Sequence, residues 1–176
     1  MSDSHNLIEL ISESDISAKV KKMGLEISSF YESESVVFVV ILNGAIIFAA
    51  DLFRAVGIEC KLDFVKVSSY KGTKSEGKIR FEKDLTLDIS GKNIIIVEDI
   101  IDTGNTIKYL KKHMKRKNPK SIRVASLLMK PDSSDISSKI DWLGFEISSE
   151  FVVGYGLDYN QEFRNLNAIY KLGETI

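Results

Sequence analysis

Three acidic residues and a turn of small polar residues follow one strongly apolar run in this sequence. The run, residues 94–97, contains only β-branched side chains, which predicts a strand that is buried on both faces. The acids that follow the run are Glu98, Asp99 and Asp102, and the turn that completes the segment is Thr103, Gly104, Asn105 and Thr106. Carboxylates in this position can bind sugar hydroxyls, take up a proton or bind a divalent cation.

The turn at residues 103–106 has the features of a phosphate site. Apolar residues at i, i+3 and i+7, namely Ile107, Leu110 and Met114, predict a helix directly after it. The first amides of a helix have no partner within the helix, and the helix dipole favours an anion beside them. Gly104 tolerates a positive φ and lets an anion approach the backbone. Taken alone, the turn is also consistent with a simpler interpretation, in which the acids only interact with the positive end of the helix dipole.

Two other predicted strands end in residues that could line the same site. Residues 36–42 form an apolar run that ends in Asn43 and Gly44. Residues 122–129 form another apolar run, and Lys130 follows it directly. The carboxyl ends of parallel strands meet at one edge of a sheet, and open α/β sheets bind their ligands at that edge. A lysine at a strand end could also be simply solvated.

The remaining elements are expected to support this edge. A capping box at Ser12 and Asp15 predicts an amphipathic first helix, whose apolar face contains Ile16, Val20, Met23, Ile27 and Phe30. Further predicted elements are a helix over residues 46–53, strands over 62–67, 81–89, 142–147 and 151–155, and a polar loop over 133–139. Residues 68–78 are rich in glycine and serine and form either a disordered insert or a lid. We favour a lid, because Tyr70 could close onto a ligand.

The composition is that of one ordinary globular domain spanning residues 1–176. Hydrophobic residues make up 44% of the chain and charged residues 28%, which is enough for a substantial core. A net charge of −1 provides no basic field for nucleic acid or an anionic membrane. The single cysteine, Cys60, excludes an internal disulfide and a multi-cysteine metal site. The N-terminal residues lack the pattern of a targeting signal and no apolar run could span a bilayer, so we expect a cytoplasmic protein.

The central segment resembles a known motif. Four apolar residues, two acids, two apolar residues and Asp-Thr-Gly-x-Thr form the phosphoribosyl pyrophosphate (PRPP) motif of the type I phosphoribosyltransferases, and residues 94–106 match every position. Residues 151–160, together with Phe163 and Arg164, resemble the purine-binding hood of the hypoxanthine-guanine members of this family. Residues 124–130 are similar to the strand that carries their base-recognition lysine.

The resemblance implies a fold and a reaction. The fold is a twisted, mainly parallel sheet with helices on both faces, plus a small hood formed mainly by the N-terminal segment and residues 140–176. The reaction transfers the 5-phosphoribosyl group of PRPP to hypoxanthine or guanine and gives IMP or GMP and pyrophosphate, with Mg²⁺ as cofactor. A homodimer or homotetramer is expected. Two alternatives stay open: a PRPP- or nucleotide-sensing regulator of the same fold that binds RNA, which the near-neutral charge disfavours, and a xanthine-preferring transferase.

The resemblance also implies roles for single residues. Glu98 and Asp99 would contact the ribose hydroxyls, one directly and one in support, because adjacent strand residues point to opposite sides. Asp102 would be the general base near purine N7. The 5′-phosphate would be held by Thr103, Gly104, Asn105 and Thr106. The base would be bound by Lys130 at its exocyclic O6, by stacking on Phe151 and by the backbone of Val152.

The remaining implied roles concern pyrophosphate and the metal. Arg164 would contact pyrophosphate, and the metal-linked acids would be Asp158, Glu98 and Asp99. The pyrophosphate loop would consist of Leu42, Asn43 and Gly44, with a cis Leu42–Asn43 peptide, as is often found in this family. The mobile catalytic loop would contain Ser69 and Tyr70. Family members commonly carry a lysine where this chain has Asn43, so either backbone amides make the contact, or a cation comes from Lys66, Lys71 or Arg164.

Overall fold

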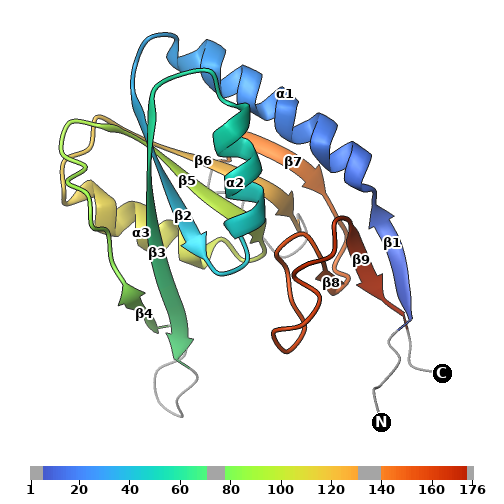
Figure 1. Cartoon of the computed structure of the whole chain (residues 1–176). Coiled ribbons are helices and arrows are strands. Elements are labelled where there is room, and N and C mark those ends of the chain that lie inside the picture. Colours follow the sequence, from blue (N-terminus) through green and yellow to red (C-terminus); the bar gives the residue numbers. More distant parts are fainter. Residues whose placement is uncertain (1–5, 71–77, 131–139, 174–176) are drawn as a thin grey trace.

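A six-stranded sheet forms the centre of the protein in a computed structural model that describes residues 6–70, 78–130 and 140–173 (Figure 1). The strand order is β4-β3-β2-β5-β6-β7. Neighbouring strands are parallel except β4, which runs antiparallel to β3. The strands are β2 (Val36–Leu42), β3 (Cys60–Tyr70), β4 (Lys78–Lys83), β5 (Asn93–Ile101), β6 (Ser121–Met129) and β7 (Trp142–Glu146).

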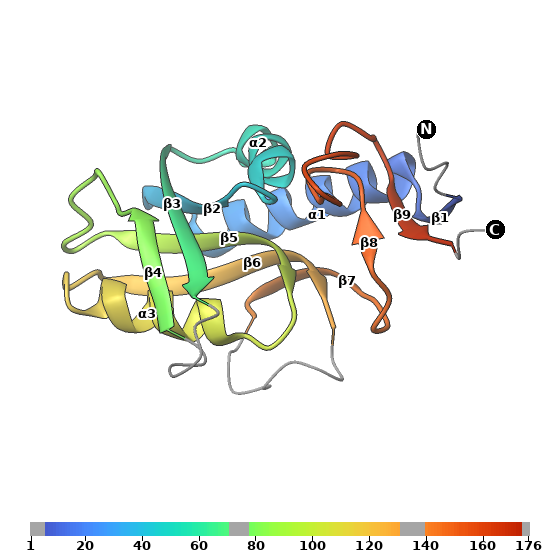
Figure 2. The ribbon, with the colours of Figure 1, turned by 90° about the horizontal axis from the view of Figure 1, so that it is seen from below.

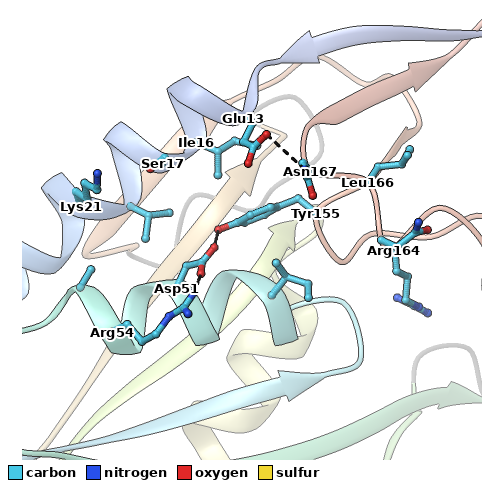
Figure 3. Close-up of a pocket in the computed structure, with 14 residues that line it drawn as sticks. Glu13, Ile16, Ser17, Lys21, Asp51, Arg54, Tyr155, Arg164, Leu166 and Asn167 are labelled. Carbon is cyan, nitrogen blue, oxygen red and sulfur yellow. Dashed lines mark hydrogen bonds and ion pairs between the residues drawn. The ribbon is translucent and has the colours of Figure 1, made fainter.

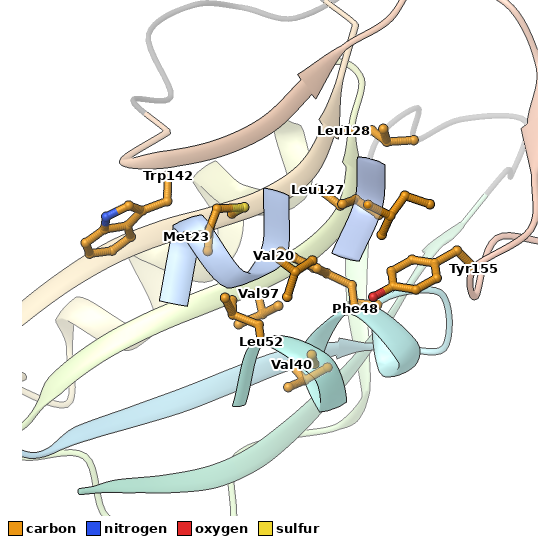
Figure 4. Packing of buried hydrophobic residues seen from close by; sticks show 14 of the residues in the cluster. Val20, Met23, Val40, Phe48, Leu52, Val97, Leu127, Leu128, Trp142 and Tyr155 are labelled. Carbon is orange, nitrogen blue, oxygen red and sulfur yellow. The ribbon is translucent and has the colours of Figure 1, made fainter. Parts of the chain in front are cut away.

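Helices cover both faces of this sheet, which confirms the predicted fold class (Figure 2). Helices α1 (Glu13–Tyr31) and α2 (Ile46–Ala55) lie on one face, and α3 (Asn105–Lys115) lies on the other. Each face has its own apolar core. Figure 4 shows the first core, in which side chains of α1 and α2 pack on Val40 and Val97 of the central strands. Two covered faces explain why β2 and the first half of β5 are continuous apolar runs.

A second, three-stranded sheet lies beside the β7 edge of the large one (Figures 1 and 2). Its order is β1-β9-β8, with β1 (Leu7–Ile11), β9 (Ile169–Leu172) and β8 (Val152–Val153). All its pairs are antiparallel. We call it the small sheet. The chain between β8 and β9 returns toward the carboxyl ends of the central strands, where its Gly156 packs against Gly44.

The first helix confirms most of its predicted pattern. The Ser12 hydroxyl accepts a hydrogen bond from the Asp15 amide at 3.2 Å, and the predicted apolar face is buried as far as Ile27. The prediction was wrong at Phe30, which is 52% exposed. Tyr31 is buried instead. The Phe30 ring lies at the surface, with the Arg123 guanidinium 4.1 Å from its centre.

Several other boundaries differ from those predicted, and the strand predicted over residues 151–155 is limited to Val152–Val153 in β8. Strand β5 continues through the acids as far as Ile101, because its pairing with β6 extends beyond the apolar run. The strand predicted over residues 81–89 is β4, which begins at Lys78 and ends at Lys83. Within the expected lid, residues 68–70 are paired with residues 78–80 in β3 and β4, so this part is a hairpin rather than a loop. The rest of the lid, 71–77, and the polar loop at 133–139 lie outside the described residues.

Among the described residues, the helices are too short or too polar to cross a bilayer.

Candidate active site

The turn between β5 and α3 has the geometry that an anion site needs. Gly104 is the N-cap of α3 and has a φ of 71°, the left-handed conformation that glycine adopts without strain. Among the described residues, no side chain caps this helix end. The Asn105 amide donates a long hydrogen bond of 3.5 Å to the Thr103 hydroxyl. A bond of this length is weak enough for an anion to replace it, so the first amides of α3 are available to an anion, and Thr106 lies half-buried beside them.

Glu98 and Asp99 carry perturbed carboxyl groups at the end of β5. Burial, and then the charge of Asp99, raise the pKa of Glu98 well above its usual range. The Oε2 atom of Glu98 is buried and has no hydrogen-bond partner within the described part of the chain. Burial also raises the pKa of Asp99 to about 6, although the Ile100 amide donates a 2.8 Å hydrogen bond to Oδ1. Asp102, directly after the end of β5, is exposed. The site thus contains two acids in a poorly solvated setting and one acid open to solvent.

The segment after β2 lies directly against these acids. The Leu42–Asn43 peptide is cis, as the resemblance implied. Gly44 allows a close approach, since a β carbon on it would stand 1.6 Å from Oδ2 of Asp99. A β carbon on Gly156 would in turn stand 2.1 Å from the Gly44 carbonyl oxygen. Residues 42–44 are therefore held between β5 and the chain that leaves the small sheet.

That chain also brings Asp158 and Arg164 to the site. Their side chains form a 2.7 Å ion pair, and the other Asp158 oxygen accepts a hydrogen bond from the Gln161 amide at 2.9 Å. Arg164 Nη1 donates to the Gly156 carbonyl at 2.7 Å. The charges of Arg164 and Asp158 both act on the pKa of Asp99. Five predicted residues therefore lie together: Asn43, Gly44, Asp99, Asp158 and Arg164.

Lys130 lies beside the β5 end through the sheet register. Ile101 pairs with Met129, and the Lys130 amide donates to the Ile101 carbonyl at 2.9 Å. Lys130 and Asp102 thus follow adjacent strands at the same sheet edge. Lys130 is half-buried, so its side chain has a limited range of positions.

Val152 belongs to the small sheet and Phe151 directly precedes it in the chain, so neither follows a central strand. Phe151 is 54% exposed and makes an edge-to-face contact with Tyr159, with ring centres 5.9 Å apart. Val152 is buried and paired with Lys171 across β8 and β9. Ser69 and Tyr70 form the end of β3, paired with Ile79 and Lys78.

Two of the three cations considered as substitutes for a lysine at position 43, Lys66 and Arg164, have acidic partners. Lys66 pairs with Leu42 in the sheet register and forms a 2.8 Å ion pair with Glu82. The two side chains are 41% and 44% exposed, so another anion can replace Glu82 as the partner of Lys66 at little cost in free energy. Arg164 is paired with Asp158, and Lys71 lies outside the described residues.

The carboxylates fit a metal held largely by its substrate. Within the described ranges, no cluster of three or more His, Cys, Asp or Glu side chains could hold an ion alone. Mg²⁺ usually binds one or two carboxylates and takes its remaining oxygens from phosphates and water. Glu98, with its unpartnered oxygen, and Asp99 are suitable donors. Both oxygens of Asp158 are engaged, so a link through water suits it better than direct coordination.

A pocket of about 450 Å³ lies elsewhere, between α1, α2 and the chain that follows β8 (Figure 3). Of the described residues that line it, only Arg164 was predicted to belong to the site. Its wall contains a contact that sequence reasoning missed, in which the Tyr155 hydroxyl donates to Oδ2 of Asp51 at 2.5 Å. The available signals were a lone acid in a mostly apolar helix and a tyrosine between two glycines, Gly154 and Gly156.

Comparison with known proteins agrees with this geometry. The phosphoribosyl transferase domain family matches residues 11–160. The hypoxanthine phosphoribosyltransferase of Haemophilus influenzae is 40% identical over 172 residues, which cover 96% of each chain. The hypoxanthine-guanine phosphoribosyltransferase of Mycobacterium bovis is 38% identical over 174 residues, covering 95% of this chain and 86% of the relative.

Solved structures give the same result. The hypoxanthine-guanine phosphoribosyltransferase of Bacillus anthracis superimposes with a TM-score of 0.90 at 40% identity, covering 94% of this chain and 98% of the other. A ternary substrate complex of Trypanosoma cruzi hypoxanthine phosphoribosyltransferase superimposes with a TM-score of 0.89 at 31% identity, covering 96% of each chain.

The chain belongs to the phosphoribosyltransferase family and is an enzyme that transfers a pentosyl group. Within that family it is of the hypoxanthine-guanine type, which serves purine salvage.

Proposed function

We propose that this protein transfers the 5-phosphoribosyl group of PRPP to hypoxanthine or guanine, and releases IMP or GMP and pyrophosphate. The observation that supports this most is the meeting of two features at one sheet edge. The open helix end at residues 103–106 suits a phosphate, and Lys130 on the next strand suits a 6-oxo purine. A site with both features can hold the two halves of a purine nucleotide.

Positioning and charge would drive the reaction. A purine ring nitrogen displaces pyrophosphate at C1 of the ribose, through a transition state with positive charge on the sugar. Residues 103–106 would hold the 5′-phosphate, and Glu98 and Asp99 would hold the ribose hydroxyls, one directly and the other in support. The raised pKa values of these two acids reflect poor solvation, which sugar hydroxyls would relieve by donating hydrogen bonds. Such positioning can supply a large part of the rate enhancement.

Asp102 would take the proton that the purine loses. It is exposed at the strand end, and its neighbour across the sheet, Lys130, would donate to the exocyclic oxygen of the same base. Phe151 would stack on the ring, and the backbone of Val152 would bind its edge. The exposed face of Phe151 is available for such stacking.

The leaving pyrophosphate would be held by the amides of Asn43 and Gly44 and by Arg164, with Lys66 as a further cation beside Leu42. Mg²⁺, when bound, would neutralise pyrophosphate charge, with Glu98, Asp99 and, through water, Asp158 as its protein partners. Ser69 and Tyr70, on the hairpin next to β2, would cover the site during the reaction, and the small sheet and its return chain would act as the hood.

Steady-state assays with PRPP, Mg²⁺ and each of four purines test this function. Hypoxanthine and guanine should be converted and adenine should not. A strong preference for xanthine would replace the proposed substrates while keeping the reaction class. Absence of turnover with every purine, together with specific RNA binding, would favour the regulatory alternative. A homodimer or homotetramer and a cytoplasmic location stay predictions.

A further inference from the structure

The loop at residues 42–44 depends on where α2 lies. The loop joins β2 to α2, whose N-cap residue, Ala45, provides no side-chain hydrogen bond. The first residues of the helix, Ile46 and Ile47, are 46% and 39% exposed, so the core holds them only weakly. Anchoring of α2 comes from further along the helix, where Phe48, Ala49 and Leu52 are buried in the core and one polar side chain adds a second anchor.

Asp51 provides such an anchor in the second turn. It accepts a 2.5 Å hydrogen bond from the hydroxyl of Tyr155, which is only 6% exposed (Figure 3). Burial, and then the bond to Asp51, raise the pKa of Tyr155, so its hydroxyl stays a donor. Asp51 is also paired with Arg54 on the same helix. The bond joins residues 104 positions apart, and its two ends belong to α2 and to the chain after β8.

The next residue, Gly156, touches the loop itself. Its φ of 102° and its close contact with the Gly44 carbonyl both exclude a larger side chain. Its own amide donates to the Arg164 carbonyl at 2.9 Å, and its carbonyl accepts from the Arg164 guanidinium at 2.7 Å. Residues 155 and 156 therefore contact both α2 and the loop that α2 continues.

We infer that Tyr155 and Asp51 are positioning residues, whose hydrogen bond holds the amides of Asn43 and Gly44 where PRPP requires them. The inference rests on the proposed function, and it assigns these residues no contact with substrate. If the bond is lost, α2 can shift away from the small sheet, and residues 42–44 move with its first turn. The effect should therefore fall on the pyrophosphate end of PRPP and leave the purine subsite unchanged.

Tyr155→Phe tests this directly, because it removes one oxygen and keeps the ring. We expect KM for PRPP, and the dissociation constant of Mg²⁺-pyrophosphate, to rise about tenfold, as for a buried hydrogen bond whose partner is left unpaired. KM for hypoxanthine should change less than twofold by the same reasoning. Asp51→Ala should raise KM for PRPP to a similar extent. The double variant should show no larger rise than the more strongly affected single variant, because both substitutions remove the same hydrogen bond.

Tyr31→Phe is the matched control. Tyr31 is equally buried, at 5% exposure, and belongs to the same core, but it lies at the end of α1 and packs on Trp142. Tyr31→Phe should leave KM for PRPP unchanged, and its melting temperature should be comparable to that of Tyr155→Phe. If Tyr155→Phe lowers the melting temperature but leaves KM for PRPP at the wild-type value, Tyr155 is only structural and the inference is wrong. The inference would also be overturned if the effects of Tyr155→Phe and Asp51→Ala on KM for PRPP were additive in the double variant. Failure of the wild type to bind PRPP would refute the proposed function instead.

Discussion

Oδ2 of Asp99 lies directly against the α carbon of Gly44, so close that a β carbon at residue 44 would stand 1.6 Å from it. This contact joins the end of β5 to the loop after β2. It gives one carboxylate two roles, as a candidate ribose ligand and as a wall of the candidate pyrophosphate loop.

Substitution of Gly44 should therefore be severe. Gly44→Val would push the loop away from Asp99 and crowd the approach of an anion, so PRPP affinity should fall at least 10²-fold, as for a misplaced site. Asn43→Ala should be mild, since backbone amides make the contact. Gly57→Ala is a suitable control, because a β carbon there meets nothing closer than 3.9 Å. PRPP binding by calorimetry measures all three. Abolished binding in Asn43→Ala with intact binding in Gly44→Val would show that the side chain is the ligand.

The raised pKa of Asp99 predicts a pH dependence of stability. The folded protein keeps this proton to about pH 6, whereas the unfolded chain releases it near pH 4, so ionisation of Asp99 lowers stability as the pH rises through that window. Asp99→Asn removes this cost. The free energy of unfolding of the variant, relative to wild type, should rise by about 2–3 kcal/mol between pH 4 and pH 7.

Asp63→Asn provides a control of opposite sign. Burial alone would raise the pKa of Asp63, but hydrogen bonds from the amides of Leu87, Phe64 and Thr86 lower it overall. Asp63 therefore stabilises the fold above the usual carboxyl pKa, and this contribution is lost as the pH falls through its lower folded value. Relative to wild type, Asp63→Asn should become less stable as the pH rises. Parallel trends for the two variants in urea unfolding would contradict the assignment.

Lys130 should decide which purine is used. A donor that faces O6 of hypoxanthine would meet an amino group in adenine, and both groups would be left unpaired. Loss of such a pairing lowers kcat/KM by roughly 10⁴–10⁵-fold. Lys130→Met should reduce kcat/KM for hypoxanthine and leave the weak rate with adenine unchanged. Comparable rates of the wild type with adenine and hypoxanthine would refute this role.

The sequence was sufficient for the parts of the fold that depend on local pattern. The β-branched run before Glu98 predicted β5, and the apolar spacing after Thr106 predicted α3, because each depends on neighbouring residues. The positive φ of Gly104 is one that glycine was expected to tolerate. The end of β5 was not predictable in this way. The strand continues to Ile101 because of its pairing with Met129, which the apolar pattern does not report.

Contacts between distant segments could not be predicted. Gly44 meets Asp99 through the register of β2 with β5, and Tyr155 meets Asp51 across 104 positions. Phe30 and Tyr31 show the same limit: both rings contact Trp142, yet only Tyr31 is buried, and the helical spacing does not distinguish the two.

Turnover of Asp102→Asn, with hypoxanthine, PRPP and Mg²⁺, shows whether Asp102 acts as the general base of phosphoribosyl transfer in this site. The asparagine keeps the shape of the side chain but cannot take up the purine proton. Formation of IMP should fall by roughly 10²–10⁴-fold, the usual contribution of a general base, while PRPP binds as in the wild type. Near-normal turnover by the variant, or no IMP formation by the wild type under the same conditions, would contradict the account.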